Sequence, residues 1–128
     1  MSEHFPRALT EREAAVLDHL LSVDFPGRDA LVAQRDLVEV SGRWDDEPTI
    51  ELEVPGNAAR AEVEEDSPVY VTTSDGRFEV LLLVAYGRLK LIELVDSAGQ
   101  GMPPELPAPD QLTEPIALGP TAARSWWR

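Results

Sequence analysis

The sequence predicts an α+β fold in which an N-terminal helix pair packs on a five- to six-stranded antiparallel meander sheet. Three observations predict it. Apolar residues recur at helical spacing up to about residue 35, alternate with polar residues from Leu37 onward, and give way to a proline-rich segment after Asp96. A chain of 128 residues has the usual size of one domain. We therefore expect a single α+β domain over residues 1–110 and an extended, Pro-rich C-terminal tail over residues 111–128.

The first predicted helix spans residues 11–22. Thr10 and Glu13 have the spacing of a capping box, in which each side chain accepts a hydrogen bond from the other residue's main-chain N–H group. Apolar residues then follow at helical intervals and form one stripe: Val16, Leu17, Leu20 and Leu21.

A second, shorter helix is predicted over residues 27–35. Pro26 and Gly27 end the first apolar pattern, and Asp24 lies where a capping residue of the next helix would stand. We expect the two helices to pack as a pair, because neither is long enough to be stable alone.

The strands follow from alternation of apolar and polar residues. The expected strands cover residues 38–43, 50–54, 60–64, 69–73, 78–86 and 89–95. The strand over 60–64 has the weakest pattern and suits an edge. The nearly continuous apolar run over 78–86 favours a central strand covered on both faces, one of them by the helix pair. Gly87 and Arg88 are expected to form the two-residue turn that follows it.

Composition excludes several classes of function. The net charge is −13, which argues against a nucleic-acid partner because phosphate backbones are bound by clustered basic residues. The chain has no cysteine, so thiolate metal sites and thiol nucleophiles are excluded. The longest apolar run, Val80 to Tyr86, is too short to span a membrane, and the first residues lack the pattern of a signal peptide. These features predict a cytoplasmic protein with no membrane partner.

The most distinctive stretch is Gly42 to Val54, in which an acidic loop precedes an alternating strand. Ile50, Leu52 and Val54 alternate with acids, which indicates a strand with these residues facing the core and the other face exposed to solvent. Three interpretations of the acids are open: a solvated hairpin, a surface for a protein partner, and a site of hard oxygen ligands for Mg²⁺ or Ca²⁺. The binding candidates are Trp44, Asp45, Asp46, Glu47, Glu51 and Glu53.

Aromatic and basic residues meet again at the C-terminus. Tryptophan and arginine are enriched at interface hot spots, so the segment is a candidate for contact with a second subunit, although packing on its own sheet is the plainer reading. The candidate oligomer-interface residues are Trp126, Trp127 and Arg128.

The stretches "FPRALTEREAAVLDHLLSVDFPGRDAL", "GRWDDEPTIELEV" and "VLLLVAYGRLKLIELVD" resemble a family of small uncharacterised proteins common in actinobacteria. The likeness covers about residues 5–110 and implies one compact domain. In that family the first loop tends to be rich in cysteine, and Pro-Leu-Pro follows the last strand. Here the residues from Trp44 to Glu47 occupy that loop, so a thiol-based role would not carry over.

These patterns together predict a non-enzymatic acidic protein that works by binding a protein partner or by self-association. Neither a catalytic residue nor a cofactor or metal is assigned, and the chain has neither a Gly-x-Ser-x-Gly motif nor a Walker lysine. The alternatives are an immunity-type inhibitor of a basic toxin, whose attraction would come from opposite charge, and a carboxylate-based divalent metal protein or enzyme. A small-molecule pocket between the helix pair and the sheet is a further option.

Overall fold

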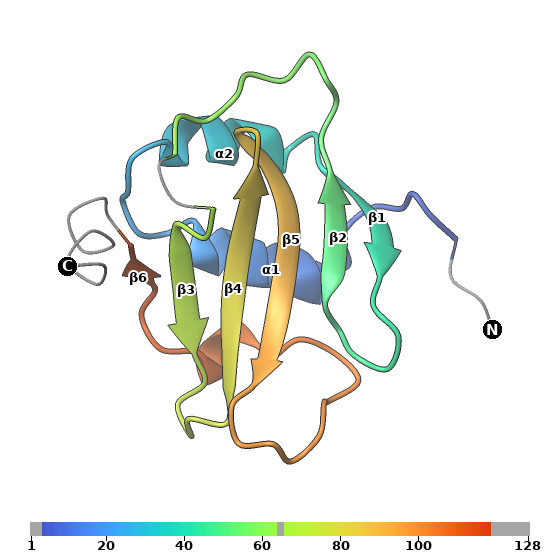
Figure 1. The fold of residues 1–128 in the computed structure, drawn as a ribbon, viewed down its shortest axis with the longest axis vertical. Coiled ribbons are helices and arrows are strands. Elements are labelled where there is room, and N and C mark those ends of the chain that lie inside the picture. The colour runs from blue at the N-terminus through green and yellow to red at the C-terminus, as the bar shows by residue number, and fades with distance from the viewer. Residues whose placement is uncertain (1–3, 64–65, 119–128) are drawn as a thin grey trace.

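Figure 1 shows the computed structural model of the chain, which describes residues 4–63 and 66–118. As predicted, two helices precede an antiparallel sheet, which here has six strands. The helices are α1 (Glu11–Leu20) and α2 (Arg28–Arg35), and a short 3-10 helix, η1, covers Pro109–Gln111. The strands are β1 (Glu39–Arg43), β2 (Ile50–Glu53), β3 (Val69–Thr72), β4 (Phe78–Ala85), β5 (Arg88–Asp96) and β6 (Ile116–Ala117).

The predicted capping box begins α1. The Thr10 hydroxyl accepts a hydrogen bond from the Glu13 N–H group at 3.1 Å, and the Glu13 carboxylate accepts one from the Thr10 N–H group at 2.9 Å. The same carboxylate receives two hydrogen bonds from Arg7, at 2.7 and 3.0 Å, so the arm before the helix is fixed to its first turn. The predicted apolar stripe is buried in the core.

The prediction that Asp24 caps α2 was wrong. The capping position is Gly27, with φ of +89° and no side-chain hydrogen bond. A Cβ atom at Gly27 would lie 2.7 Å from the main-chain oxygen of Glu62. The turn between the helices therefore requires glycine both for its left-handed backbone and for close approach of the loop after β2.

The strand order across the sheet is β1-β2-β5-β4-β3-β6, with every neighbouring pair antiparallel. Strands β3, β4 and β5 form the predicted meander. The β1–β2 hairpin lies on the far side of β5, so the chain between β2 and β3 crosses the end of the sheet (Figure 1). A bulge interrupts the β1–β2 ladder between Val40 and Gly42, and another interrupts the β4–β5 ladder between Leu83 and Val84.

The prediction of a strand over 60–64 was wrong. Residues 60–63 form no strand, and the sixth strand of the sheet is β6. The Ala61 N–H group donates to the Gly87 oxygen at 2.8 Å, and the Ala61 side chain is buried. The main chain here is thus bonded to the tip of the β4–β5 hairpin, at the end of the sheet, instead of running along a neighbouring strand.

The predicted boundary between domain and tail, at residue 110, lies inside the packed part of the chain. Leu106 and Leu112 are both buried in the core. The Thr113 N–H group donates to the Thr72 oxygen at 2.9 Å, and the Leu118 N–H group donates to the Pro68 oxygen at 2.8 Å. The sequence pattern does not show that these leucines are buried, because prolines before and after them leave each apolar residue alone between turns.

Both helices lie on one side of the sheet (Figure 1). The prediction that the strand over 78–86 is covered on both faces was therefore wrong. Along β4, Val80, Leu82 and Val84 are buried toward the helices, whereas Leu81 and Leu83 alternate with them and are only half-buried. No described helix covers the other face.

The β4–β5 turn also differs from the prediction. It consists of Tyr86 and Gly87, with φ of +53° and +74°, and β5 begins at Arg88. Two successive left-handed residues are typical of a type I′ hairpin turn, whose twist matches that of the flanking strands. Tyr86 is 86% exposed at the tip.

Candidate functional site

The uncovered side of the sheet carries aliphatic side chains at its centre. Residues directly opposite on neighbouring strands lie on the same side of a sheet. The register places Leu81 opposite both Tyr70 and Glu93, and it places Leu83 opposite Leu91. We define the open sheet face as Tyr70, Leu81, Leu83, Leu91 and Val95 together with the acids Glu51, Glu79 and Glu93.

The leucines of the open sheet face shield one another from water. Leu91 is only 8% exposed, and it lies between Leu83 on β4 and Glu51 on β2. Antiparallel sheets with one solvated face normally place polar residues on that face. A cluster of aliphatic side chains rimmed by acids is instead typical of a surface that contacts another molecule.

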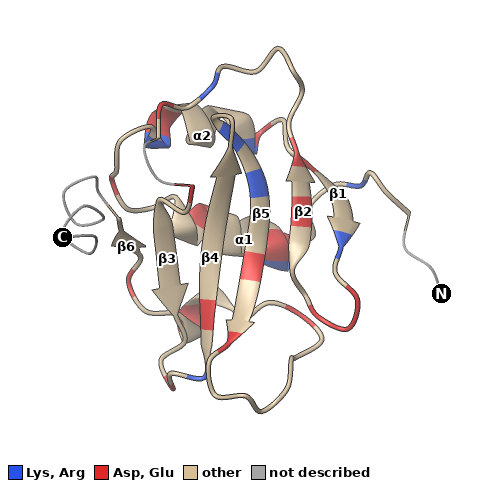
Figure 2. Cartoon of the chain, viewed as in Figure 1, with Lys and Arg blue, Asp and Glu red and all other residues tan. Residues whose placement is uncertain are grey.

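Charge is distributed unevenly over the open sheet face. Figure 2 shows basic residues on β5 near the β4–β5 turn and acidic residues on β2 and toward the other ends of β4 and β5. Gly42 lies opposite Glu51, whose carboxylate is about 3.5 Å from the place a Cβ atom of Gly42 would take. The missing side chain leaves room for that carboxylate over β1.

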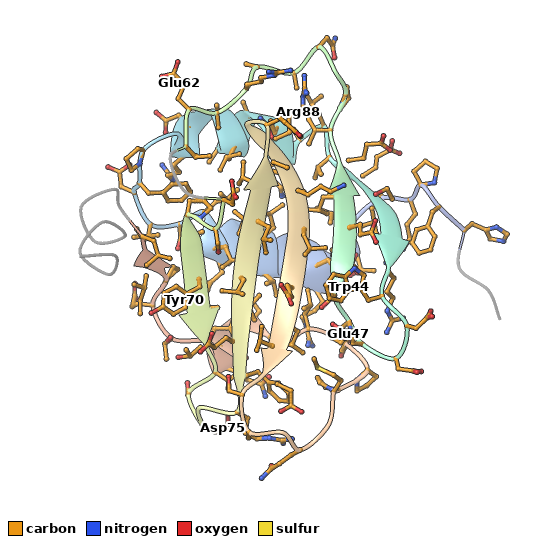
Figure 3. All side chains as sticks on the ribbon, in the orientation of Figure 1. Trp44, Glu47, Glu62, Tyr70, Asp75 and Arg88 are labelled. Carbon is orange, nitrogen blue, oxygen red and sulfur yellow. The ribbon has the colours of Figure 1, made fainter. Side chains whose placement is uncertain are left out.

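The acidic loop, Trp44 to Glu47, joins β1 and β2 at one corner of the sheet (Figure 3). The Trp44 N–H group donates to the Thr49 oxygen at 3.0 Å, and Asp46 has a left-handed φ of +61°. Trp44 is 38% exposed, and the two aspartates are exposed. The loop is a tight hairpin turn in which the aspartate side chains are in water.

Glu47 has a structural role in this loop. Its carboxylate accepts a hydrogen bond from the Thr49 hydroxyl at 2.6 Å, and that hydroxyl accepts one from the Leu94 N–H group at 3.0 Å. Thr49 is completely buried. These bonds join the hairpin to β5, so one oxygen of the Glu47 carboxylate is already hydrogen-bonded within the fold.

The acids of β2 point away from the loop. Ile50 and Leu52 are buried in the core, as predicted, and the alternating Glu51 and Glu53 face water. Glu53 lies directly opposite Glu39 of β1. Like charges in this position repel each other. The structure therefore separates the six predicted binding residues into a corner loop and an acidic border of the open sheet face.

A buried glutamine, which sequence reasoning missed, organises the other end of the sheet. Gln34 is 1% exposed, and its amide donates to the oxygens of Ala59 and Gly87, both at 2.8 Å. Its side-chain oxygen accepts a hydrogen bond from the Leu89 N–H group at 2.9 Å. The spacing of three residues from buried Leu31 was the signal that could have identified it. This one side chain joins α2, the loop after β2 and the β4–β5 turn.

Two open clefts, of about 620 and 860 Å³, lie on either side of the proline-rich segment 103–107. Arg12 lines both of them and donates to the Leu106 oxygen at 2.8 Å. Arg43 donates to the Pro104 oxygen at 3.0 Å. These arginines hold the segment against the domain, and the first cleft is lined by the first turns of α1 together with Arg43 of β1.

Two carboxylates hold the loops at the opposite end of the sheet from Gln34. Three main-chain N–H groups, led by that of Gly101 at 2.7 Å, donate to Asp96 and lower the pKa of its carboxyl. The Thr73 hydroxyl, at 2.7 Å, and the Arg77 N–H group lower the pKa of Asp75 in the same way. The Gly-Gln-Gly loop thus cradles the protein's own carboxylate.

We expect acid to weaken the fold through these two groups. A carboxyl with a lowered folded-state pKa stabilises the protein above its unfolded pKa, near 4, and that contribution is lost as pH falls through the folded value. Asp96→Asn should lower the urea midpoint at pH 6 and lose less on transfer to pH 3 than the wild type does. Asp110→Asn, at an exposed position on η1, is the control. Equal acid sensitivity of wild type and Asp96→Asn would contradict this assignment.

Three further findings concern the C-terminal residues, metal ligation and membrane spans. The candidate interface residues Trp126, Trp127 and Arg128 lie outside the described residues. Within residues 4–63 and 66–118, no group of three or more histidine or acidic side chains is placed to hold a metal ion. No helix among these residues is both long enough and apolar enough to cross a membrane. Comparison with known protein families, with curated proteins and with solved structures finds no match to this chain.

Proposed function

We propose that this protein works in the cytoplasm by binding another protein chain through the open sheet face, without catalysing a reaction. The observation that carries the proposal is the contiguous set of Leu81, Leu83 and Leu91 on a sheet side that no described helix covers. Interfaces combine a central apolar patch with a polar rim. The acids Glu51, Glu79 and Glu93 supply such a rim here.

Substitution of Leu83 tests this proposal directly. Leu83 is half-buried on the open sheet face, so Leu83→Glu places a charge in the centre of the contact while leaving the core intact. Leu37→Glu is the matched control, because Leu37 is 49% exposed in the connection between α2 and β1. The three proteins would be used to capture binding partners from the native cell, with identification by mass spectrometry.

We expect a partner that is retained by the wild type and by Leu37→Glu and is lost with Leu83→Glu. Circular dichroism and thermal melting of each variant establish that loss of binding is not loss of fold. Partners that bind all three proteins equally would show that the open sheet face is not the contact surface.

The immunity-type alternative, in which the protein covers a basic toxin, is favoured by one specific observation. Glu39 and Glu53 face each other directly across β1 and β2, an arrangement that costs stability. A basic partner would relieve that repulsion and would be attracted at long range. The acidic border, with Glu51 beside the pair, gives such a partner its contact.

Glu53→Lys distinguishes this alternative. The lysine would face Glu39 and replace repulsion with attraction, so we expect a slightly higher free energy of unfolding, by about 0.2–1 kcal/mol. The same change should weaken and slow the binding of a basic protein, and the loss should shrink as salt is added. Unchanged binding at low salt, measured by surface plasmon resonance, would remove the acidic border from the interface.

A further inference from the structure

We propose that the partner of the open sheet face is a second copy of this chain, packed face to face about a two-fold axis that runs across the strands. The inference rests on the proposed function and adds the identity of the partner. A two-fold interface needs a surface that is complementary to itself. On β4 and β5 the open sheet face has that property, because an apolar centre separates a basic end from an acidic end; Glu51 of β2 lies beside the basic end, opposite Leu91.

The basic end is created by the bulge in the β4–β5 ladder. Leu83 pairs with Leu91 and Val84 pairs with Leu89, which leaves Lys90 as the extra residue. Lys90 is exposed. Arg88 lies at the same end, where it pairs with the half-buried Ala85 next to the turn. Its guanidinium donates a hydrogen bond to the Gly56 oxygen at 2.7 Å (Figures 2 and 3).

The acidic end lies beyond the leucines. Glu93 is opposite Leu81, and Glu79 is opposite Val95, two residues further from the turn. Both glutamates are half-buried at the rim of the apolar centre. Asp96 at the end of β5 already binds three N–H groups of its own loop, so Glu79 and Glu93 are the acids that a partner can use.

With the axis centred on β4 and β5, only one of the two face-to-face arrangements brings their opposite charges together. An axis along the strands would set the basic end of one copy on the basic end of the other. An axis across the strands, at the level of the Leu82–Ile92 pair, sets the basic end of one copy on the acidic end of the other. Leu83 and Leu91 of one copy then meet the row that contains Leu81 and Glu93 of the other, with Lys90 close to Glu93.

The size of the face places such a dimer among the small, transient interfaces. Strands β2 to β6 present roughly 450 Å² of sheet per copy, taking about 3.4 Å per residue along a strand and about 4.8 Å between strands. Two copies together would cover roughly 900 Å², below the roughly 1,200 Å² of the smallest standard interfaces. We therefore expect a weak, reversible dimer with a dissociation constant on the order of tens to hundreds of micromolar.

Sedimentation equilibrium of the full chain, from about 5 to 500 µM, tests the proposal. The average mass should rise toward twice the monomer mass with concentration. Leu83→Glu should raise the dissociation constant at least tenfold, whereas Leu37→Glu should leave it unchanged. Lys90→Glu and Glu93→Lys should each weaken self-association, because each places two like charges at the contact between positions 90 and 93.

Mixing the last two variants gives the sharpest result. A Lys90→Glu copy carries glutamate at both positions 90 and 93, and a Glu93→Lys copy carries lysine at both. An equimolar mixture should therefore form a heterodimer with two opposite-charge contacts, which neither variant forms alone. Failure of the mixture to associate, or a wild-type chain that stays monomeric at 500 µM, would overturn the proposal. In that case, a different partner lost with Leu83→Glu would still support the binding function itself.

Other occupants of the face give different outcomes. A dimer that survives Leu83→Glu but disappears with Trp126→Ala and Trp127→Ala would assign self-association to the C-terminal residues and overturn the proposal. The charge pairing also predicts a salt effect: the difference in dissociation constant between the wild type and Lys90→Glu should shrink between 50 mM and 500 mM salt, and a difference that does not shrink would contradict the assigned orientation.

Discussion

Replacing Gln34 with alanine is expected to lower the free energy of unfolding by about 3 kcal/mol, a large share of the stability of a small domain. The change removes three hydrogen bonds to main-chain groups and leaves the Leu89 N–H group buried without a partner. An orphaned buried donor costs about 1–3 kcal/mol, and the cavity left by the side chain adds to that cost. Urea denaturation followed by circular dichroism gives the value.

Arg35→Ala is the matched control, because Arg35 is the next residue of α2 and pairs with Asp18 near the surface at 2.8 Å. Surface ion pairs of this kind contribute up to about 1 kcal/mol. If Gln34→Ala costs no more than Arg35→Ala, the buried amide does not hold the hairpin tip as the hydrogen bonds indicate.

Substitution of Gly87 by alanine should be comparably severe. Gly87 has a left-handed φ of +74°, and a Cβ atom there would lie 2.7 Å from the Ala61 oxygen and 2.8 Å from the Arg60 Cβ. The left-handed backbone alone costs an alanine about 1–2 kcal/mol. The contact with Ala61 must also be relieved, which displaces the loop and weakens the 2.8 Å hydrogen bond between its N–H group and Gly87. We expect a total loss of about 3 kcal/mol.

Gly76 separates these two contributions. It has nearly the same φ, +76°, but an added Cβ atom would meet nothing within 4 Å. Gly76→Ala should therefore cost only the backbone term, about 1–2 kcal/mol. Thermal unfolding of both variants gives the difference between them, which measures the close packing at Gly87; a difference near zero would mean that the loop moves aside freely.

The parts of the fold that the sequence predicted well are those whose signal is local. The capping box of Thr10 and Glu13 and the alternation of Ile50 and Leu52 with Glu51 depend on residues next to one another in the chain. Strand β6 depends on pairing with β3, and buried Leu112 depends on pairing with Thr73 just after β3; these partners lie about 40–50 residues earlier in the sequence. No periodic pattern in the neighbouring residues predicts such long-range contacts.

The open sheet face was missed for a related reason. In the run from Phe78 to Ala85 nearly every residue is apolar, so the two faces of the strand look alike in the sequence. Only the placement of both helices on one side shows that Leu81 and Leu83 face away from the core. The acidic loop was predicted as a binding candidate because its composition is unusual. In the structure, Glu47 is hydrogen-bonded to Thr49 and the two aspartates are exposed to solvent.

The two edges of the sheet determine what kind of assembly is open to this protein. At the β1 edge, Arg7 exchanges hydrogen bonds with Val40 at 3.0 and 2.8 Å, and the bulge that follows distorts the ladder. At the other edge, β6 has two residues and follows Pro115, which has no N–H group to donate. Neither edge offers a long, regular template for strand addition, which is the step that builds fibrils. The face-to-face contact that we propose is instead complete when two copies meet, so it would give a finite assembly and not an open-ended polymer.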